Sequence, residues 1–151
     1  MTTPDIAPLE GEFDPPKEGW VADQLAAIDE AGDTRAADIQ GMAVVVYTVR
    51  GKRSGKLRRV PLMRVTDGRA YAAVASKGGA PQHPAWYHSM TANPRVDLQD
   101  GTQTRPHMVR ELSGDERETW WQRCVEAFPP YARYQADTDR QIPVLLAEPL
   151  S

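Results

Sequence analysis

The pattern of apolar and polar residues predicts strands over much of the chain. Residues 42–50 (MAVVVYTVR) form a continuous β-branched run, which is typical of a strand covered on both faces. The connection GKRSG and the pair Asp67-Gly68, a strong hairpin signal, indicate that the next two strands follow the first one antiparallel and in sequence. The expected strands are residues 42–50, 57–66, 69–75, 95–99, 102–112 and 142–147.

Helical spacing of apolar residues appears between and after these strands. Gly32 marks the break of a first amphipathic helix, and Pro84 stands in the first turn of a second. Ser113 and Glu116 have the spacing of a capping box, and Pro129-Pro130 ends the helix that it opens. The expected helices lie within residues 18–38, 84–90, 113–128 and 131–138. Antiparallel strands with peripheral helices favour an α+β domain built on a small, partly open β-barrel.

The length of 151 residues is that of one domain. We interpret residues 1–17, rich in proline and acid, as a mobile N-terminal arm or a loose strap, and residues 18–151 as the single domain. The first residues lack the basic start and apolar stretch of a secretory signal, and no run approaches the roughly 18 apolar residues of a membrane span. With a single cysteine, Cys124, these features predict a cytoplasmic protein.

Positive charge is concentrated in one short segment, although the net charge is −3. Between Arg50 and Arg59 there are six cations and no acid, which predicts a local site for a phosphate or carboxylate. A solvated hairpin is an equally good interpretation of this stretch alone. The negative net charge and the lack of aromatic residues among the cations argue against a nucleic-acid partner.

A second candidate site is the segment VASKGGAPQHPAWY, which cannot be regular structure between Ser76 and Gln82. Ser76 and Lys77 offer a hydroxyl and a cation, two glycines open the backbone, and a helix N-terminus follows, where anions bind. Trp86 and Tyr87 could form an aromatic wall for a flat ring. A flexible surface connection is the alternative, and the spacing is not that of a dinucleotide fingerprint.

Aromatic residues recur three apart at Phe128, Tyr131 and Tyr134. Phenols beside a cation can bind and protonate an oxygen acceptor, although such helical spacing by itself favours core packing. The histidines lack the i, i+4 pairing of helical zinc sites, so we expect no metal. The absence of a G-x-S-x-G elbow or a Ser-His-Asp order leaves hydrolysis without support.

Four sequence blocks together resemble the deazaflavin (coenzyme F-420)-dependent nitroreductase family of actinobacteria. They are GKRSGKLRRVPLMRV, DGRAYAAVASKGGAPQHPAWY, TANPRVDLQDG and GDERETWWQRCVEAFPPYARYQADTDRQIPV, followed by the closing AEP. The resemblance implies a split β-barrel related to FMN-binding oxidoreductases. It also implies coenzyme F-420 as the cofactor and hydride transfer from its reduced form to a quinone or nitroaromatic acceptor.

The same resemblance implies roles for individual residues. The coenzyme's phosphate and glutamate tail would meet Lys52, Arg53, Lys56, Arg58 and Arg59. Its ribityl and ring portion would be held by Ala75, Ser76, Lys77, Gly78 and Ala80, with Pro84, Trp86 and Tyr87 packing behind it. The acceptor would contact Tyr131, Tyr134 and Ser76. Phe128 stands where a related member has another tyrosine, and Met63 where some relatives have an aromatic residue, so the preferred acceptor is left open.

Other functions remain compatible with the sequence. A non-catalytic coenzyme carrier would bind the tail but keep the acceptor pocket closed, and a related barrel could bind FMN or haem instead. The oligomeric state is not indicated. The first helix, with Trp20, Val21 and Leu25, could touch a membrane to reach a lipid quinone, although it carries Asp23 and little positive charge.

Overall fold

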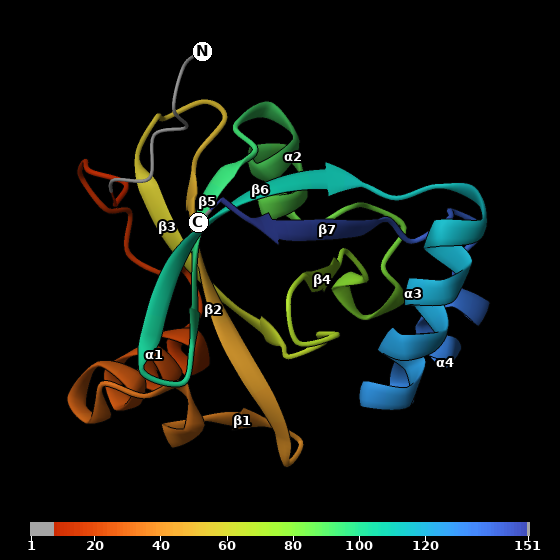
Figure 1. The fold of residues 1–151 in the computed structure, drawn as a ribbon, viewed down its shortest axis with the longest axis horizontal. Coiled ribbons are helices and arrows are strands. Elements are labelled where there is room, and N and C mark those ends of the chain that lie inside the picture. Colours follow the sequence, from red (N-terminus) through yellow and green to blue (C-terminus); the bar gives the residue numbers. More distant parts are fainter. Residues whose placement is uncertain (1–7, 151) are drawn as a thin grey trace.

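A computed structural model describes residues 8–150 and shows a curled antiparallel sheet with α-helices around it (Figure 1). The strands are β1 (Asp38–Ile39), β2 (Met42–Arg50), β3 (Leu57–Met63), β4 (Tyr71–Val74), β5 (Arg95–Asp100), β6 (Gln103–Glu111) and β7 (Val144–Pro149). The α-helices are α1 (Gly19–Ala31), α2 (Ala85–Ala92), α3 (Gly114–Ala127) and α4 (Pro130–Ala136), and the 3₁₀ helices are η1 (Thr34–Ala36) and η2 (Lys77–Gly79). The continuous run 42–50 is a strand as predicted, and Gly32 caps α1 in the left-handed region at φ 67°.

The sheet is organised around β2, which pairs with β1, β3 and β5. From β5 the order continues through β6 and β7 to β4, and every named pairing is antiparallel. In Figure 1 the sheet curls, so that α1 lies near one end and α3 and α4 lie together near the other. The predicted α+β fold on a partly open barrel is confirmed.

The expected pairing of the third strand is wrong. The chain does turn at Asp67 and Gly68, but only the isolated bridge between Thr66 and Tyr71 links the two arms of this turn as strand neighbours. β4 pairs along its length with β7 instead. Local turn chemistry, in which the Asp67 carboxylate accepts from the backbone amides of residues 69 and 70, fixed the reversal but not the strand partner.

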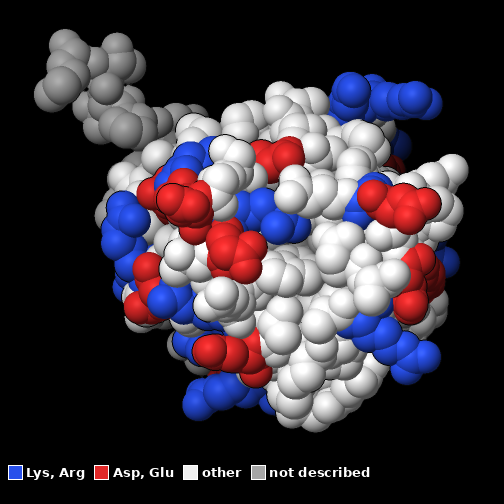
Figure 2. Space-filling model, turned by 90° about the vertical axis from the view of Figure 1, so that its right-hand side faces the viewer, with Lys and Arg blue, Asp and Glu red and all other residues white. Residues whose placement is uncertain are grey.

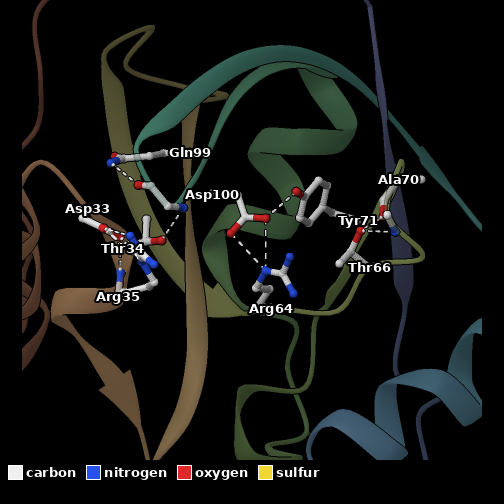
Figure 3. A network of polar contacts seen from close by, with 11 residues as sticks. Asp33, Thr34, Arg35, Arg64, Thr66, Ala70, Tyr71, Gln99 and Asp100 are labelled. Atoms are coloured by element: carbon white, nitrogen blue, oxygen red, sulfur yellow. Dashed lines mark hydrogen bonds and ion pairs between the residues drawn. The ribbon is translucent and has the colours of Figure 1, made fainter.

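A polar network ties this turn region to the rest of the sheet (Figure 3). The Tyr71 hydroxyl donates to the Asp100 carboxylate at 2.5 Å, and the Arg64 Nε lies 3.0 Å from both oxygens of that carboxylate. Burial, reinforced by Asp100, raises the pKa of Tyr71 to about 12. The three residues join the end of β3, the start of β4 and the end of β5.

Apolar side chains fill both sides of the curled sheet. One cluster lies among β4, β7, α3 and α4, and includes Trp120 and Phe128. A second lies around β2, β5 and the middle of β7, and a third holds α1 on β2 through Leu25 and Ile28. Within residues 8–150, no helix combines the length and apolar character that a bilayer span requires.

The capping box expected at the start of α3 does not form. The Ser113 hydroxyl makes no capping hydrogen bond, and the Glu116 carboxylate instead takes two hydrogen bonds of 2.7 Å from the Arg110 guanidinium. A paired charge with forked geometry binds a carboxylate more strongly than a neutral backbone amide does. The helix begins where predicted, but Glu116, which was expected to cap it, forms an ion pair with Arg110 of β6 instead.

Residues 8–17 run beside β3 as a strap that Figure 1 shows in red at the N-terminal end of the described chain. Leu57 donates its backbone N–H to the carbonyl of Glu12, and its carbonyl accepts from the N–H of Asp14, both at 2.8 Å. Arg50 adds a bond to the carbonyl of Glu10 at 3.0 Å. These bonds place residues 8–17 along β3, and residues 1–7 of the expected arm or strap lie outside the described part of the chain.

Candidate functional site

A groove of about 680 Å³ lies between β3, the loop after β4, the start of α2, α4 and the start of α1. Its lining brings together many residues that the sequence predicts as a site. They are Arg58, Arg59, Ser76, Lys77, Gly78, Pro84, Trp86, Tyr131 and Tyr134. Segments more than seventy residues apart in the sequence thus share one concave surface with a mixed apolar and cationic character.

The loop of residues 75–83 is clamped from the far side by Arg140. Its guanidinium donates to the backbone carbonyls of Ala75, Ser76 and Ala80 at 3.1, 2.7 and 2.8 Å. It also lies 2.9 Å from Nδ1 of His83, and because a guanidinium can only donate, this nitrogen accepts. Burial, followed by Arg140, lowers the pKa of His83. One side chain therefore fixes most of the loop that forms a wall of the groove.

Within this loop, Lys77–Gly79 form a tight turn closed by two backbone hydrogen bonds, from Gly79 to Ser76 at 2.9 Å and from Ala80 to Lys77 at 3.1 Å. Three successive residues have positive φ: Lys77 at 47°, Gly78 at 64° and Gly79 at 84°. At Gly79 a Cβ would stand 2.9 Å from the carbonyl oxygen of Tyr134, so only glycine allows the loop to approach α4 this closely. This approach sets the loop against the helix that carries the candidate phenols.

The phenols of α4 form an aromatic group with Phe128. The ring centroid of Tyr131 lies 5.0 Å from that of Phe128 and 6.3 Å from that of Tyr134. Tyr131 is 6% exposed, and burial raises the pKa of its hydroxyl, which therefore stays protonated near neutral pH. The hydroxyls of Ser76, Tyr131 and Tyr134 make no hydrogen bond to any other described residue, while all three residues line the groove. These groups are available to a ligand.

The cations of the hairpin differ in what they contact. Arg59 forms a bidentate pair with Asp29 of α1, at 2.6 and 2.7 Å, which lowers the pKa of that carboxyl. Lys56 lies 3.6 Å from Glu12 and 3.8 Å from Asp14 of the strap. Arg58 lies 3.5 Å from Asp14. Figure 2, which shows the face toward α3 and α4, likewise has acids beside cations, so no broad field of one sign covers that face.

Several predicted site residues lie outside the groove lining. Lys52 and Arg53 are exposed at the hairpin turn, and neither has an ion-pair partner within 4.0 Å in the described chain. Lys56 sits beside the strap, and the side chains of Ala75 and Ala80 do not line the groove. The Tyr87 hydroxyl donates to Glu111 at 2.5 Å, and burial together with this bond raises its pKa to about 12.

Sequence reasoning missed the role of Arg140 and most of the contribution of the N-terminal residues. The lining also includes Pro16, Lys17, Glu18 and Gln40, for which the sequence predicts no role. Met63, expected to affect the acceptor, lies there too, together with Trp20 and Val21 of the first helix. Trp20 is 54% exposed at the start of α1. For Arg140 no local signal exists, because its partners lie 57 to 65 residues away in the sequence.

The fold and the groove define a class of protein before any comparison. A curled antiparallel barrel carries a groove lined by an aromatic wall, by cations and by hydroxyls without partners among the described residues, as expected for a protein that binds a flat ring with an anionic tail. The family of F420H(2)-dependent quinone reductases matches residues 20–149, and the chain belongs to it.

Individual relatives agree with this assignment. A solved structure titled "Structure of F420-H2 Dependent Reductase (FDR-A)", from Mycobacterium smegmatis, is 56% identical, covers 70% of this chain and 93% of its own, and has a TM-score of 0.67. Another, titled as a domain-swapped dimer, is 50% identical, covers 85% of this chain and 97% of its own, and has a TM-score of 0.70. In Mycobacterium tuberculosis H37Rv, Rv3178 is 36% identical over 100 residues, 66% of this chain and 84% of that protein. Rv1261c, named an F420H(2)-dependent quinone reductase, is 34% identical over 99 residues, which are 64% of this chain and 66% of that protein.

The residues present fit coenzyme F-420. The groove offers Trp86 as a wall for a flat ring and a loop whose positive φ angles open backbone next to it. Arg58 lines the groove near the start of β3, and Lys56 and the hairpin turn lie just before this strand. A ring bound in the groove would therefore have cations along the path of its tail. Arg and Lys are the side chains that bind phosphate and carboxylate groups.

Proposed function

We propose that this protein transfers a hydride from reduced coenzyme F-420 to a quinone bound in the groove. The observation that carries the proposal is the set of hydroxyls of Ser76, Tyr131 and Tyr134, which line the groove without partners among the described residues. The coenzyme, when bound, supplies the hydride and its electron pair. The protein positions the coenzyme and the quinone, excludes water from the groove and supplies the protons.

The hydroxyls have a definite task in this reaction. Adding a hydride to a quinone places negative charge on oxygen, which a neutral O–H donor stabilises and can protonate. Burial keeps Tyr131 protonated, so its hydroxyl donates. Ser76 is fixed through its backbone carbonyl by Arg140, and Tyr134 through the contact of its backbone with Gly79. A donor held in advance costs no reorganisation when charge develops.

The test is oxidation of reduced coenzyme F-420 by menadione, followed by the absorbance of the oxidised coenzyme. Tyr134→Phe should lower kcat/KM on the order of a hundred-fold. This is the low end of the effect usual for the loss of one hydrogen-bond donor, because the hydroxyls of Ser76 and Tyr131 remain. Tyr87→Phe is the matched control, since it removes a phenol hydroxyl that bonds to Glu111 outside the groove. Equal activity of both variants would contradict the donor role, and no coenzyme binding by the unaltered protein would refute the function.

The same assay separates the other candidates. Tight coenzyme binding without turnover across a panel of quinones would identify a carrier, and preferential uptake of FMN or haem would move the protein to another group of split barrels. We extend the proposal to nitroaromatic acceptors, because their reduction also develops negative charge on oxygen near the same donors. Replacing menadione with a nitroaromatic compound tests this extension directly.

Contact with a lipid surface would rest on Trp20, which is exposed at the start of α1 and lines the groove. The acids Asp23, Asp29 and Glu30 on the same helix oppose binding to anionic bilayers. Pelleting with zwitterionic liposomes that Trp20→Ala abolishes would establish the contact. Without pelleting, acceptors would have to reach the groove from water.

A further inference from the structure

The strap of residues 8–17 places carboxylates on the cations that the coenzyme tail needs. Its backbone is fixed to Leu57 of β3 by two hydrogen bonds of 2.8 Å, through Glu12 and Asp14. Since Leu57 stands between Lys56 and Arg58, this bridge sets the two acids beside the two cations. The result is a short run of acids, alternating along the strap, that lies where an acidic tail would lie.

The ion pairs of the strap are loose, unlike the pair that holds α1. Nitrogen to oxygen distances are 3.6 Å for Lys56 with Glu12, 3.8 Å for Lys56 with Asp14 and 3.5 Å for Arg58 with Asp14. Arg59 and Asp29, in contrast, meet bidentately at 2.6 and 2.7 Å. Long single contacts between partly exposed groups are the kind that contribute little to stability. They can be exchanged for carboxylates of a ligand without unfolding anything.

The exchange requires only side chains to move. The backbone bonds of the strap to Leu57 do not involve the carboxylates, and Ser54, which donates to Asp14 at 3.4 Å, is exposed at the turn. Lys52 and Arg53 have no carboxylate within 4.0 Å in the described chain, so they can meet the far end of a tail first. Lys56 and Arg58 would follow as the strap acids turn away.

We propose that Glu12 and Asp14 act as an internal competitor for the anionic tail of the coenzyme, and that this competition lowers the affinity for the tailed coenzyme relative to its ring portion alone. The inference rests on the proposed function, because it takes coenzyme F-420 as the ligand. The strap acids lower affinity for every tailed form. They leave the binding of the ring itself unchanged, since neither side chain lines the groove.

The experiment compares Glu12→Gln/Asp14→Asn with Glu10→Gln. Glu10 belongs to the same strap and carries the same charge, but it makes no ion pair within the described chain. The ligands are coenzyme F-420 with several glutamates and the deazaflavin precursor that lacks both phosphate and glutamates. Dissociation constants are measured by fluorescence titration at low and at high salt.

We expect the double variant to bind the tailed coenzyme about 4- to 25-fold more tightly than the unaltered protein, taking about 2- to 5-fold for each of the two strap acids. Binding of the precursor should change by less than about 2-fold, and the gain for the tailed form should shrink at high salt because exposed charges are screened. Glu10→Gln should show little of this gain. Glu12→Gln alone, which leaves the Asp14 contact with Ser54 intact, should show part of it.

Two results would overturn the competition. One is equal affinity of the double variant and Glu10→Gln for the tailed coenzyme; the other is weaker binding by the double variant at unchanged thermal stability, which would make the strap a scaffold for the tail. If the unaltered protein binds neither ligand, the proposed function fails. Binding and turnover by the unaltered protein with no strap effect would remove only the competition.

Discussion

Removing the Arg140 side chain should loosen the loop that walls the groove. The guanidinium donates to the carbonyls of Ala75, Ser76 and Ala80, and to Nδ1 of His83, at distances between 2.7 and 3.1 Å. Ala75 is fully buried and Ser76 is 8% exposed, so water cannot freely replace the donor at these two carbonyls. Ala80 is half-buried, and its carbonyl can be hydrated.

The size of the effect follows from these two buried acceptors. Each one left without a donor costs about 1–3 kcal/mol, and water entering the vacated space recovers part of that sum. Arg140→Ala should therefore lower the free energy of unfolding by about 2–4 kcal/mol, and Tm by roughly 5–15 °C for a domain of this size. Arg140→Lys keeps the charge but replaces a fork of donors by a single nitrogen, so it should lose about half as much.

The assay is urea unfolding and thermal melting, followed by coenzyme titration under native conditions. Arg133→Ala is the matched control, because its side chain is 85% exposed on α4 and lies 4.0 Å from Asp137. It should change stability by less than about 0.5 kcal/mol. Arg140→Lys should also weaken coenzyme binding, since Ser76 and Lys77 line the groove. If Arg140→Ala were as stable as Arg133→Ala, the loop would be held by something other than the clamp.

Three further predictions concern single sites. Gly79→Ala should destabilise more than Gly78→Ala in thermal melts, because both have positive φ but only the first Cβ would meet the Tyr134 backbone, at 2.9 Å; equal losses would disprove the close approach. The lowered pKa of His83 means that the folded protein binds fewer protons than the unfolded chain, so its contribution to stability is complete above about pH 6.5 and is lost as pH falls below that value. His83→Asn should flatten this loss in urea unfolding at several pH values, and an unchanged pH profile would refute it. Tyr47→Phe should be neutral or stabilising by up to about 1 kcal/mol, because its fully buried hydroxyl has no hydrogen-bond partner within residues 8–150; a loss above about 1 kcal/mol would reveal one.

The sequence predicted most elements because their signals are local. The β-branched run of β2 and the glycine that ends α1 determine structure within a few residues, and both lie where expected. The partner of β4 is not a local property. Its small residues pair with β7, 70 to 76 positions later, because both strands pack under α3 and α4 in one apolar cluster. Turn chemistry alone indicated a simpler hairpin.

The candidate site could be predicted where its residues contribute their own chemistry. Ser76, Tyr131 and Tyr134 carry hydroxyls in recognisable blocks, and the structure brings them to one groove. Arg140 could not be found this way, because it acts through backbone carbonyls, which any residue type provides. Backbone partners leave no trace in side-chain patterns, so a residue that positions a loop is visible only in the fold.

Counting charges along the chain also gave an incomplete description of the hairpin. No acid stands between Arg50 and Arg59, yet the fold brings in acids from the strap and from α1. Cations with the same charge thereby acquire different roles. Arg50 and Arg59 stabilise the fold through short hydrogen bonds, whereas Lys56 makes only long ion-pair contacts with the strap. Because a ligand can displace only weak partners, the strength of each existing pair, rather than the number of cations, decides which of them can bind an acidic tail.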